Sequence, residues 1–285
     1  MKKPYKTVSV CGCGWLGLPL AESLVQSGYR VFGSKRDQTD ADALSAKGIQ
    51  GVCFDVYAPT ASLCNASPGI DALFSADVLV VNIPPGRRDF ERARFVNAMK
   101  SLIDTAKQQG VRQLIIVSTT SVYGEVTGNV TEETACQPNT ESGKAHRAIE
   151  DHVLKTFPET GVVLRFSGLI GAERHPAKHL AGREGIANGN DPVNLIHRDD
   201  CIQAISLIIH QQIGGEILHL SADDHPTRAA FYAWAAGEMG LPLPTFELTG
   251  GEGKCILAQG TLDTLKMSLK YPSPFDMPLP VVSAE

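Results

Sequence analysis

The sequence lacks an apolar run long enough to cross a membrane, and it lacks an excess of positive charge. Its basic start, MKKPYK, is followed by TVSVCGCG, which is too short and too interrupted by glycine for the apolar core of a signal peptide. The 26 Lys and Arg residues face 31 Asp and Glu residues, so the formal net charge is −5 and nothing favours nucleic acid or an anionic membrane as a partner. We therefore expect a cytoplasmic protein that binds neither.

The cysteines lack the paired spacing of a zinc site. Cys11 and Cys13 are the only close pair, and no second pair follows at a spacing typical of zinc ligands. We expect no metal, and we interpret the cysteines as buried thiols of a reducing compartment. They are Cys11, Cys13, Cys53, Cys64, Cys136, Cys201 and Cys255.

Internal repeats are also absent, and short apolar runs alternate instead with amphipathic stretches. This alternation predicts an α/β protein with a doubly wound parallel sheet, the Rossmann architecture. We assign residues 1–166 to this domain, completed by about 192–222, and the segments 167–191 and 223–285 to a smaller C-terminal substrate-binding lobe. Strands are predicted at 7–12, 29–34, 51–55, 76–84, 112–119, 161–167 and 215–222, and helices at 18–28, 41–48, 90–110, 146–157, 201–212 and 229–240.

The segment CGCGWLG carries three glycines in G-x-G-x-x-G spacing directly after the first predicted strand. Gly12 allows the tight turn, Gly14 lets the backbone approach a diphosphate, and Gly17 lets the next helix pack against the strand. The helix N-terminus adds free N–H groups and a partial positive charge. We therefore predict that this loop, with Trp15 and Leu16, binds a dinucleotide. The alternative is a glycine-rich turn kept for packing.

The second predicted strand ends on Ser34, Lys35 and Arg36, where NAD-binding proteins usually carry an acidic residue for the ribose 2′-hydroxyl. Two cations and a hydroxyl suit the 2′-phosphate of NADP(H). Asp37, one residue later, is the signal that would favour NAD(H) instead. Asp55 ends the third strand, either beside the adenine or as a helix cap. The sequence therefore favours NADP(H) over NAD(H).

Further motifs follow the later strands: Asn82-Ile83-Pro84, STTSVYG at 118–124, LRFSGLIG at 164–171 and LIHRDDCIQAI at 195–205. Together with the glycine loop, they make nearly the whole chain resemble an extended short-chain dehydrogenase/reductase of the NAD(P)-dependent epimerase/dehydratase branch, in its atypical bacterial YeeZ-like subgroup. The resemblance implies that Asn82, Ile83 and Pro84 contact the cofactor. It also implies a small polar or nucleotide-sugar-like substrate, and it makes a homodimer plausible.

The resemblance implies three catalytic groups as well. A Ser or Thr after the fifth strand holds the substrate oxygen, a Tyr transfers the proton, and a Lys four residues later lowers the pKa of that Tyr. Thr119 takes the first position, with Thr120 and Ser121 as neighbours that could share its task. The expected Tyr is missing from the stretch NTESGKAHRAIED at 139–151.

Two alignments of this stretch are open. The favoured one matches Glu150 to the family's terminal Glu, and it places Ser142 at the Tyr and His146 at the Lys. The other keeps Lys144 and places Thr140 at the Tyr. His146 could serve as the base for Ser142 or act directly as general acid and base. Alternatively, Ser142 caps the helix and His146 is a surface or cofactor-contact residue.

Candidate substrate residues lie in the segments where relatives line the cleft: Ser121, Tyr123, Arg165, Arg174, His175, Asn194 and His197. Each could equally be an ordinary polar group of a loop or the core, and the family uses the position of Tyr123 structurally. Two functions follow. The first is an NADP(H)-dependent oxidoreductase or epimerase with altered acid/base chemistry. The second is a non-catalytic NADP(H)-binding sensor or regulatory protein.

Overall fold

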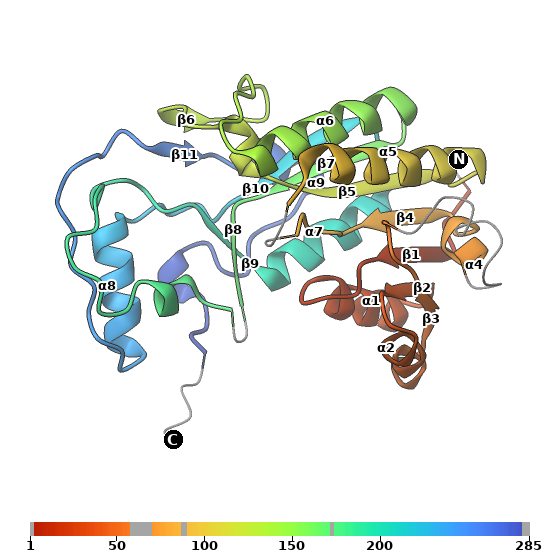
Figure 1. Cartoon of the computed structure of the whole chain (residues 1–285), viewed down its shortest axis with the longest axis horizontal. Coiled ribbons are helices and arrows are strands. Elements are labelled where there is room, and N and C mark those ends of the chain that lie inside the picture. The colour runs from red at the N-terminus through yellow and green to blue at the C-terminus, as the bar shows by residue number, and fades with distance from the viewer. Residues whose placement is uncertain (1–2, 58–69, 87–89, 172–173, 281–285) are drawn as a thin grey trace.

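The computed structural model describes residues 3–57, 70–86, 90–171 and 174–280. Parallel strands form a seven-stranded sheet in the order β10-β7-β5-β4-β1-β2-β3 (Figure 1). The chain starts in the middle of the sheet, builds outward to β3 and then returns to add β4 on the other side of β1, so the predicted doubly wound Rossmann sheet is confirmed. The strands are β1 (Thr7–Cys11), β2 (Arg30–Lys35), β3 (Ile49–Cys53), β4 (Val78–Val81), β5 (Gln113–Thr119), β7 (Gly161–Phe166) and β10 (Glu216–Leu220).

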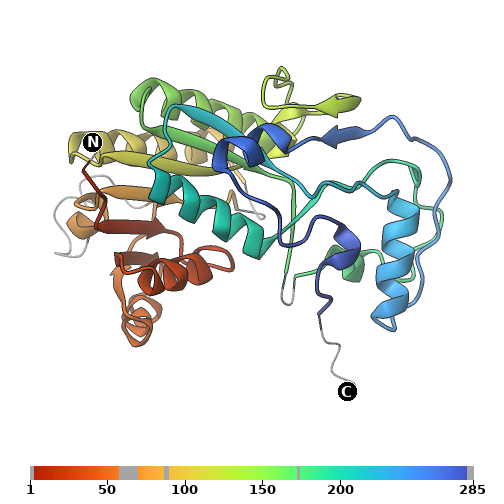
Figure 2. The ribbon, with the colours of Figure 1, turned by 180° about the vertical axis from the view of Figure 1, so that it is seen from behind.

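Helices cover both faces of this sheet. One face packs against α1, α7 and α9, and the other packs against α4, α5 and α6. Figure 2 shows α1 and α7 side by side on the first face. In the described ranges, no helix has both the length and the apolar character needed to cross a bilayer. The helices are α1 (Gly17–Gln26), α2 (Gln38–Ala43), α4 (Ile70–Phe74), α5 (Arg92–Gln108), α6 (Glu141–Thr156), α7 (Arg198–Gln211), α8 (Arg228–Glu238) and α9 (Gln259–Leu265), with short 3-10 helices η1 (Leu44–Lys47), η2 (Thr120–Tyr123), η3 (Pro176–His179) and η4 (Pro274–Asp276).

The central strands place alternate side chains on opposite faces. Val78 and Val80 of β4 pack with the α1 and α7 side, whereas Leu79 and Val81 pack with the α5 and α6 side. All four are fully buried, because each face of the sheet is covered by helices. This two-sided burial explains why the strand is a continuous apolar run in the sequence.

Smaller elements follow the carboxyl ends of β7 and β10. Figure 1 shows α8 and β11 (Lys254–Ile256) beyond that end of the sheet. β11 pairs with β6 (Gly128–Val130), and β8 (Gly168–Ile170) pairs with β9 (Leu195–His197). Neither small sheet was predicted, because strands of three residues are too short to show an alternating pattern. The residue bounds proposed for the second lobe stay a prediction.

The thiols differ in exposure. Cys11, Cys13 and Cys201 are buried, whereas Cys53, Cys136 and Cys255 are partly exposed, and Cys64 lies outside the described residues. Burial raises the pKa of Cys13 to about 12, which keeps this thiol protonated. The expectation of buried thiols is therefore met at three positions and wrong at the three partly exposed ones.

Candidate cofactor and active site

The glycine loop between β1 and α1 has two crowded positions and one open position. Gly12 has a left-handed φ of +100°, and a Cβ on it would lie 2.5 Å from the carbonyl oxygen of Asn82. A Cβ on Gly17 would lie 2.1 Å from the carbonyl oxygen of Gly12, so only glycine lets α1 start so close to the turn. A Cβ on Gly14 would have no atom within 4 Å. The loop therefore offers the open backbone surface that a dinucleotide diphosphate requires.

Two side chains hold this loop in shape. Gly12 donates its N–H to the Oγ of Ser34 at 2.9 Å, and Asn82 donates its side-chain N–H to the carbonyl oxygen of Gly12 at 3.2 Å. Ser34 is only 3% exposed, so the predicted contact of this hydroxyl with a 2′-phosphate is wrong. Ile83 lies beside Gly12, and Pro84 is exposed after it.

Charged residues stand at the ends of β2 and β3. Asp37 accepts two N–H groups from the first turn of α2, at 2.8 and 3.3 Å, and so serves as the cap of that helix. Lys35 is partly exposed, Arg36 is exposed, and neither forms an ion pair with a residue that the structure describes. Exposed Asp55 accepts the N–H of Tyr57 at 3.0 Å. The acidic residue that argued for NAD(H) is thus already engaged, whereas the two cations are available to an anion.

Hydroxyl groups gather at the carboxyl end of β5. Thr119 Oγ1 lies 3.0 Å from the Oγ of Ser121 and accepts the N–H of Ser121 at 3.2 Å. The first turn of α6 packs against this turn, because a Cβ on Gly143 would lie 3.0 Å from the carbonyl oxygen of Ser121. The predicted substrate-holding hydroxyls are therefore next to the start of α6.

The start of α6 contains the residues of both alignments. Thr140 accepts the N–H of Gly143 at 3.0 Å, which makes Thr140, not Ser142, the N-cap. Lys144 is exposed and pairs with Glu141 at 2.9 Å. Because Thr140 is occupied as a cap and Lys144 lies on the outside, the structure gives no support to the alignment that pairs them, and the alignment with Ser142 and His146 stays a prediction. The helix begins at Glu141, earlier than predicted, because the polar first turn showed no apolar periodicity.

His146 lies on the inner side of α6, one turn after partly exposed Ser142. Its ring is 8% exposed and meets Phe95 edge to face, with the centroids 6.3 Å apart. Its Nδ1 is buried and has no hydrogen-bond partner among the described residues. Burial lowers the pKa of His146, and the nearby carboxylate of Glu150 opposes that shift. The imidazole is therefore neutral at pH 7, and its interpretation as a surface histidine is wrong.

Two predicted substrate residues belong instead to a buried polar network. Arg165 donates to both carboxylate oxygens of Glu150, at 3.1 and 2.7 Å, and to the hydroxyl of Tyr123 at 3.0 Å. The Tyr123 hydroxyl also lies 2.8 Å from Nδ1 of His219. Arg165 is 1% exposed and Tyr123 is fully buried, so neither can meet a substrate and both predictions are wrong.

Three further candidates have structural contacts that the sequence did not indicate. Asn194 donates to the carbonyl oxygen of Lys254 and accepts the N–H of Ile256, both at 2.8 Å, and so ties β11 to the end of β9. The Nδ1 atoms of His175 and His197 accept the N–H two residues later, at 3.2 and 3.1 Å, and cap η3 and α7. The side-chain amide of Asn194 is thus occupied by β11 and does not contact a substrate. His175 and His197 are buried and cap their helices.

Sequence reasoning missed Arg198, the first residue of α7. Its guanidinium carbon lies 5.0 Å from the ring centroid of Trp15 in the glycine loop, and that of exposed Arg174 lies 5.2 Å from the same centroid. The motif LIHRDDCIQAI contains Arg198, but its place in the chain gives no sign that it meets a loop formed by residues 12–17.

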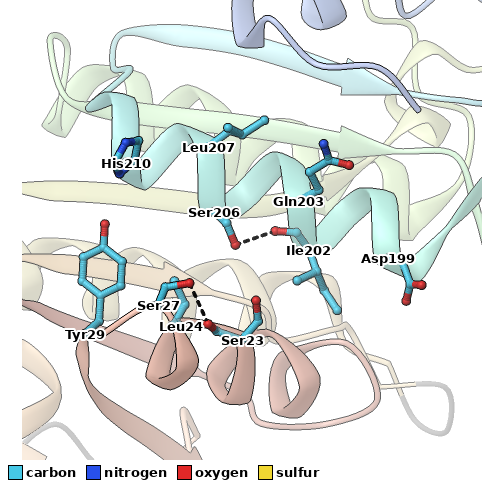
Figure 3. Close-up of a pocket in the computed structure, with 10 residues that line it drawn as sticks. All are labelled: Ser23, Leu24, Ser27, Tyr29, Asp199, Ile202, Gln203, Ser206, Leu207 and His210. Atoms are coloured by element: carbon cyan, nitrogen blue, oxygen red, sulfur yellow. Dashed lines mark hydrogen bonds between the residues drawn. The ribbon is translucent and has the colours of Figure 1, made fainter. Parts of the chain in front are cut away.

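A surface groove of about 490 Å³ lies elsewhere, between α1 and α7 (Figure 3). In Figure 3, the hydroxyls of Ser27 and Ser206 bond to carbonyl oxygens one turn back in their own helices, at 2.9 and 2.8 Å. None of the residues predicted from the sequence as site residues lines this groove. We therefore place the candidate site at the glycine loop and the adjacent start of α6.

Comparisons with known proteins identify the family of the chain. The family model for NAD(P)H-binding matches residues 12–200. Protein YeeZ of Escherichia coli (strain K12) is 37% identical over 277 residues, which cover 96% of this chain and 99% of YeeZ.

Among solved structures, UDP-glucuronic acid 4-epimerase from Bacillus cereus, in complex with NAD, has a TM-score of 0.76 at 19% identity, over 95% of this chain and 93% of that one. A short-chain dehydrogenase/reductase superfamily protein from Agrobacterium tumefaciens, with bound NAD, has a TM-score of 0.77 at 20% identity, over 95% and 94%. These two solved structures share the fold of this chain. The chain therefore belongs to the NAD(P)H-binding family whose model it matches, as a near full-length relative of YeeZ.

Proposed function

We propose that the chain is an NADP(H)-dependent oxidoreductase or epimerase that acts on a small polar or nucleotide-sugar-like substrate. The observation that carries the coenzyme preference is at the end of β2, where Asp37 is committed as a helix cap while Lys35 and Arg36 have no ion-pair partner among the described residues. A planar guanidinium and a compact ammonium together suit a phosphate dianion. When bound, the coenzyme supplies or accepts a hydride.

The chain's own residues would hold the coenzyme in three places. The open backbone at Gly14 receives the diphosphate, Lys35 and Arg36 receive the 2′-phosphate, and Asp55 lies where the adenine passes. Asn82 contributes indirectly, because its side chain braces the carbonyl of Gly12.

Proton transfer is assigned to the inner face of α6. The hydroxyls of Thr119 and Ser142 hold the substrate oxygen, and the imidazole of His146 exchanges the proton. His146 is neutral at pH 7, because burial lowers its pKa, so it can accept a proton without first losing one. The substrate class is suggested by relatives of the same fold, including MoeE5, which was solved with UDP-glucose and NAD. The homodimer that the resemblance implies stays a prediction.

The second candidate function is a non-catalytic NADP(H)-binding sensor. Two features favour it: residues 139–151 contain no Tyr, and the buried imidazole of His146 is a weaker base than a free histidine. Turnover separates the two candidates, because a sensor binds NADPH tightly and reduces no carbonyl substrate.

Fluorescence titration with NADPH and NADH tests the coenzyme assignment. We expect wild-type protein to prefer NADPH, and a Lys35→Ala, Arg36→Ala variant to bind NADPH about 100-fold more weakly, because two charge-assisted contacts are lost. NADH binding should change little in that variant. A Lys100→Ala, Lys155→Ala variant removes the same charge from α5 and α6 and serves as the control. Equal wild-type affinity for both coenzymes would show the 2′-phosphate assignment to be wrong.

A further inference from the structure

A fixed carboxylate lies one helical turn beyond His146. Glu150 is fully buried on the same inner side of α6, because residues four positions apart lie one above the other on a helix. Its two oxygens accept from the guanidinium of Arg165 at 3.1 and 2.7 Å, and one of them also accepts the hydroxyl of Ser118 at 2.5 Å. Charge-assisted bonds from two different strands thus hold this carboxylate in one orientation.

The bond between Ser118 and Glu150 joins the two parts of the candidate site. Ser118 directly precedes Thr119 at the carboxyl end of β5, and Glu150 belongs to the helix that carries His146. Because both partners are buried, water does not compete for the bond. It therefore fixes α6 against the end of β5, and it sets the separation between the Thr119 hydroxyl and the His146 imidazole.

Glu150 is also the buried negative charge that acts on His146. The elements packed against α6 are α5, β5, β7 and η2. Within the described ranges, β5 has no charged residue, η2 has Tyr123 as its titratable group, and β7 has Arg165. The other charged side chains of α5 and α6 are at least partly exposed, where water screens them. The field at the imidazole is therefore set by Glu150 and its partner Arg165.

The effect of this charge on His146 is opposite to that of burial. Burial lowers the pKa of His146, and the carboxylate of Glu150 raises it. The same carboxylate stabilises the imidazolium that forms once His146 has accepted a proton. A buried imidazole without this charge would be a weaker base.

We propose that Glu150 is a positioning residue for proton transfer: its fixed negative charge stabilises the protonated form of His146, and its bond to Ser118 holds that imidazole in register with Thr119. This inference rests on the proposed function, which assigns proton exchange to His146. Glu150 acts through His146 and not on a substrate, because it is fully buried and bonded to Arg165.

The protonation of His146 can be followed by NMR without any turnover. We expect Glu150→Gln to move the midpoint of the His146 ring signals to lower pH, because the carboxylate charge is lost while Arg165 stays charged. Replacement of both partners, Glu150→Gln with Arg165→Met, should give a smaller shift, since the charge of the pair is removed as a whole. His146→Gln assigns the signals, because it removes them.

Glu132→Gln is the matched control. Glu132 is a partly buried carboxylate that accepts the hydroxyl of Thr261 at 2.5 Å, and it lies 3.6 Å from Nε2 of His219. Its replacement should leave the His146 midpoint unchanged. Circular dichroism melting checks folding, because a purely structural role of Glu150 would lower the melting temperature without moving this midpoint.

Steady-state kinetics with NADP⁺ and UDP-glucose or UDP-glucuronic acid test the same residue in turnover. We expect Glu150→Gln to lower kcat at least about tenfold and to shift the acidic limb of its pH profile to lower pH, because the base is weaker. Ser118→Ala keeps the charge of Glu150 but breaks the tie to β5, so kcat should fall about tenfold while the acidic limb stays in place. The double variant and Ser118→Ala keep the test valid if Glu150→Gln fails to fold.

The same His146 midpoint in wild type and in Glu150→Gln would overturn this inference alone, because the carboxylate would then have no effect on the imidazole. Unchanged kcat in His146→Gln would overturn the proton exchange assigned in the proposed function, and this inference with it. If neither sugar is turned over, the NMR midpoints decide.

Discussion

At the residue scale, the favoured alignment predicts Ser142 and His146 at the positions of a catalytic Tyr and Lys, and the chemistry of the two pairs differs. A phenol ionises near pH 10 and can be brought closer to neutrality by an adjacent cation. A serine hydroxyl needs an adjacent base, and the neutral imidazole of His146 is the candidate one turn away on the same helix. On the proposed assignment, His146 would exchange the proton in place of the Tyr, with a different pKa.

Substitution of His146 tests this assignment. We expect His146→Gln to lower kcat about 100-fold with a nucleotide-sugar substrate and NADPH, because general acid–base catalysis is removed. The Kd for NADPH should stay within about twofold, since the change leaves the coenzyme contacts intact. His152→Gln, on the same helix but paired with Asp104, is the control. The contrary outcome has two parts: the wild-type protein shows no turnover, and a Ser142→Tyr, His146→Lys variant is active. Together they would identify a sensor that had lost the catalytic pair.

At the element scale, the turn between β1 and α1 combines two constraints on its glycines. Gly12 and Gly17 are required by packing, because added side-chain atoms would meet backbone oxygens at 2.5 and 2.1 Å. Gly14 is not required by packing, and we expect its role to be to leave space for the diphosphate. On this proposal, the same motif contains residues for folding and a residue for binding.

Alanine substitutions should separate these roles. We expect Gly17→Ala to lower the free energy of unfolding by about 3 kcal/mol, because the start of α1 must move away from Gly12. Gly14→Ala should keep a near wild-type free energy of unfolding and still lose at least about tenfold in NADPH affinity, as its methyl group occupies the diphosphate space. Urea unfolding and fluorescence titration measure the two effects. Unchanged NADPH affinity in Gly14→Ala would contradict the placement of the diphosphate.

At the scale of the whole molecule, buried histidines link stability to pH. Burial lowers the pKa of His146, His175, His197 and His219. For His175 the shift is from 6.5 to about 4, caused by burial and by Lys178. A histidine whose folded pKa is depressed stabilises the fold above its unfolded pKa near 6.5, and that stabilisation is lost as the pH falls through the folded value. The fold should therefore weaken in mild acid.

The pH dependence can be measured on one residue. We expect the free energy of unfolding to fall between pH 6.5 and 4, with His175 contributing roughly 3 kcal/mol of that loss. Urea unfolding of His175→Phe should show a shallower decline over this range, because its side chain cannot take up a proton. His210→Gln, which changes an exposed histidine, should follow the wild-type curve. If the free energy of unfolding fell equally with pH in wild type and in His175→Phe, His175 would have the same protonation in the folded and the unfolded chain, and this prediction would be wrong.

Much of the fold follows from local patterns in the sequence. Val78 to Val81 read as a buried strand because both faces of a parallel sheet are covered, and the spacing of Gly12, Gly14 and Gly17 is contained in six residues. Both features are set by residues that are close together along the chain, so they can be recognised in the sequence alone. The Rossmann sheet and the dinucleotide loop were therefore predictable.

The sequence by itself determined the seven strands of the central sheet, the longer helices between them and the position of the glycine loop. Only the tertiary structure decided that Arg165 and Tyr123 are buried, that Thr140 caps α6, and that Arg198 lies on Trp15, 183 residues away in the chain. The physical reason is that exposure and charge pairing depend on contacts between distant segments, which periodicity along the chain does not record.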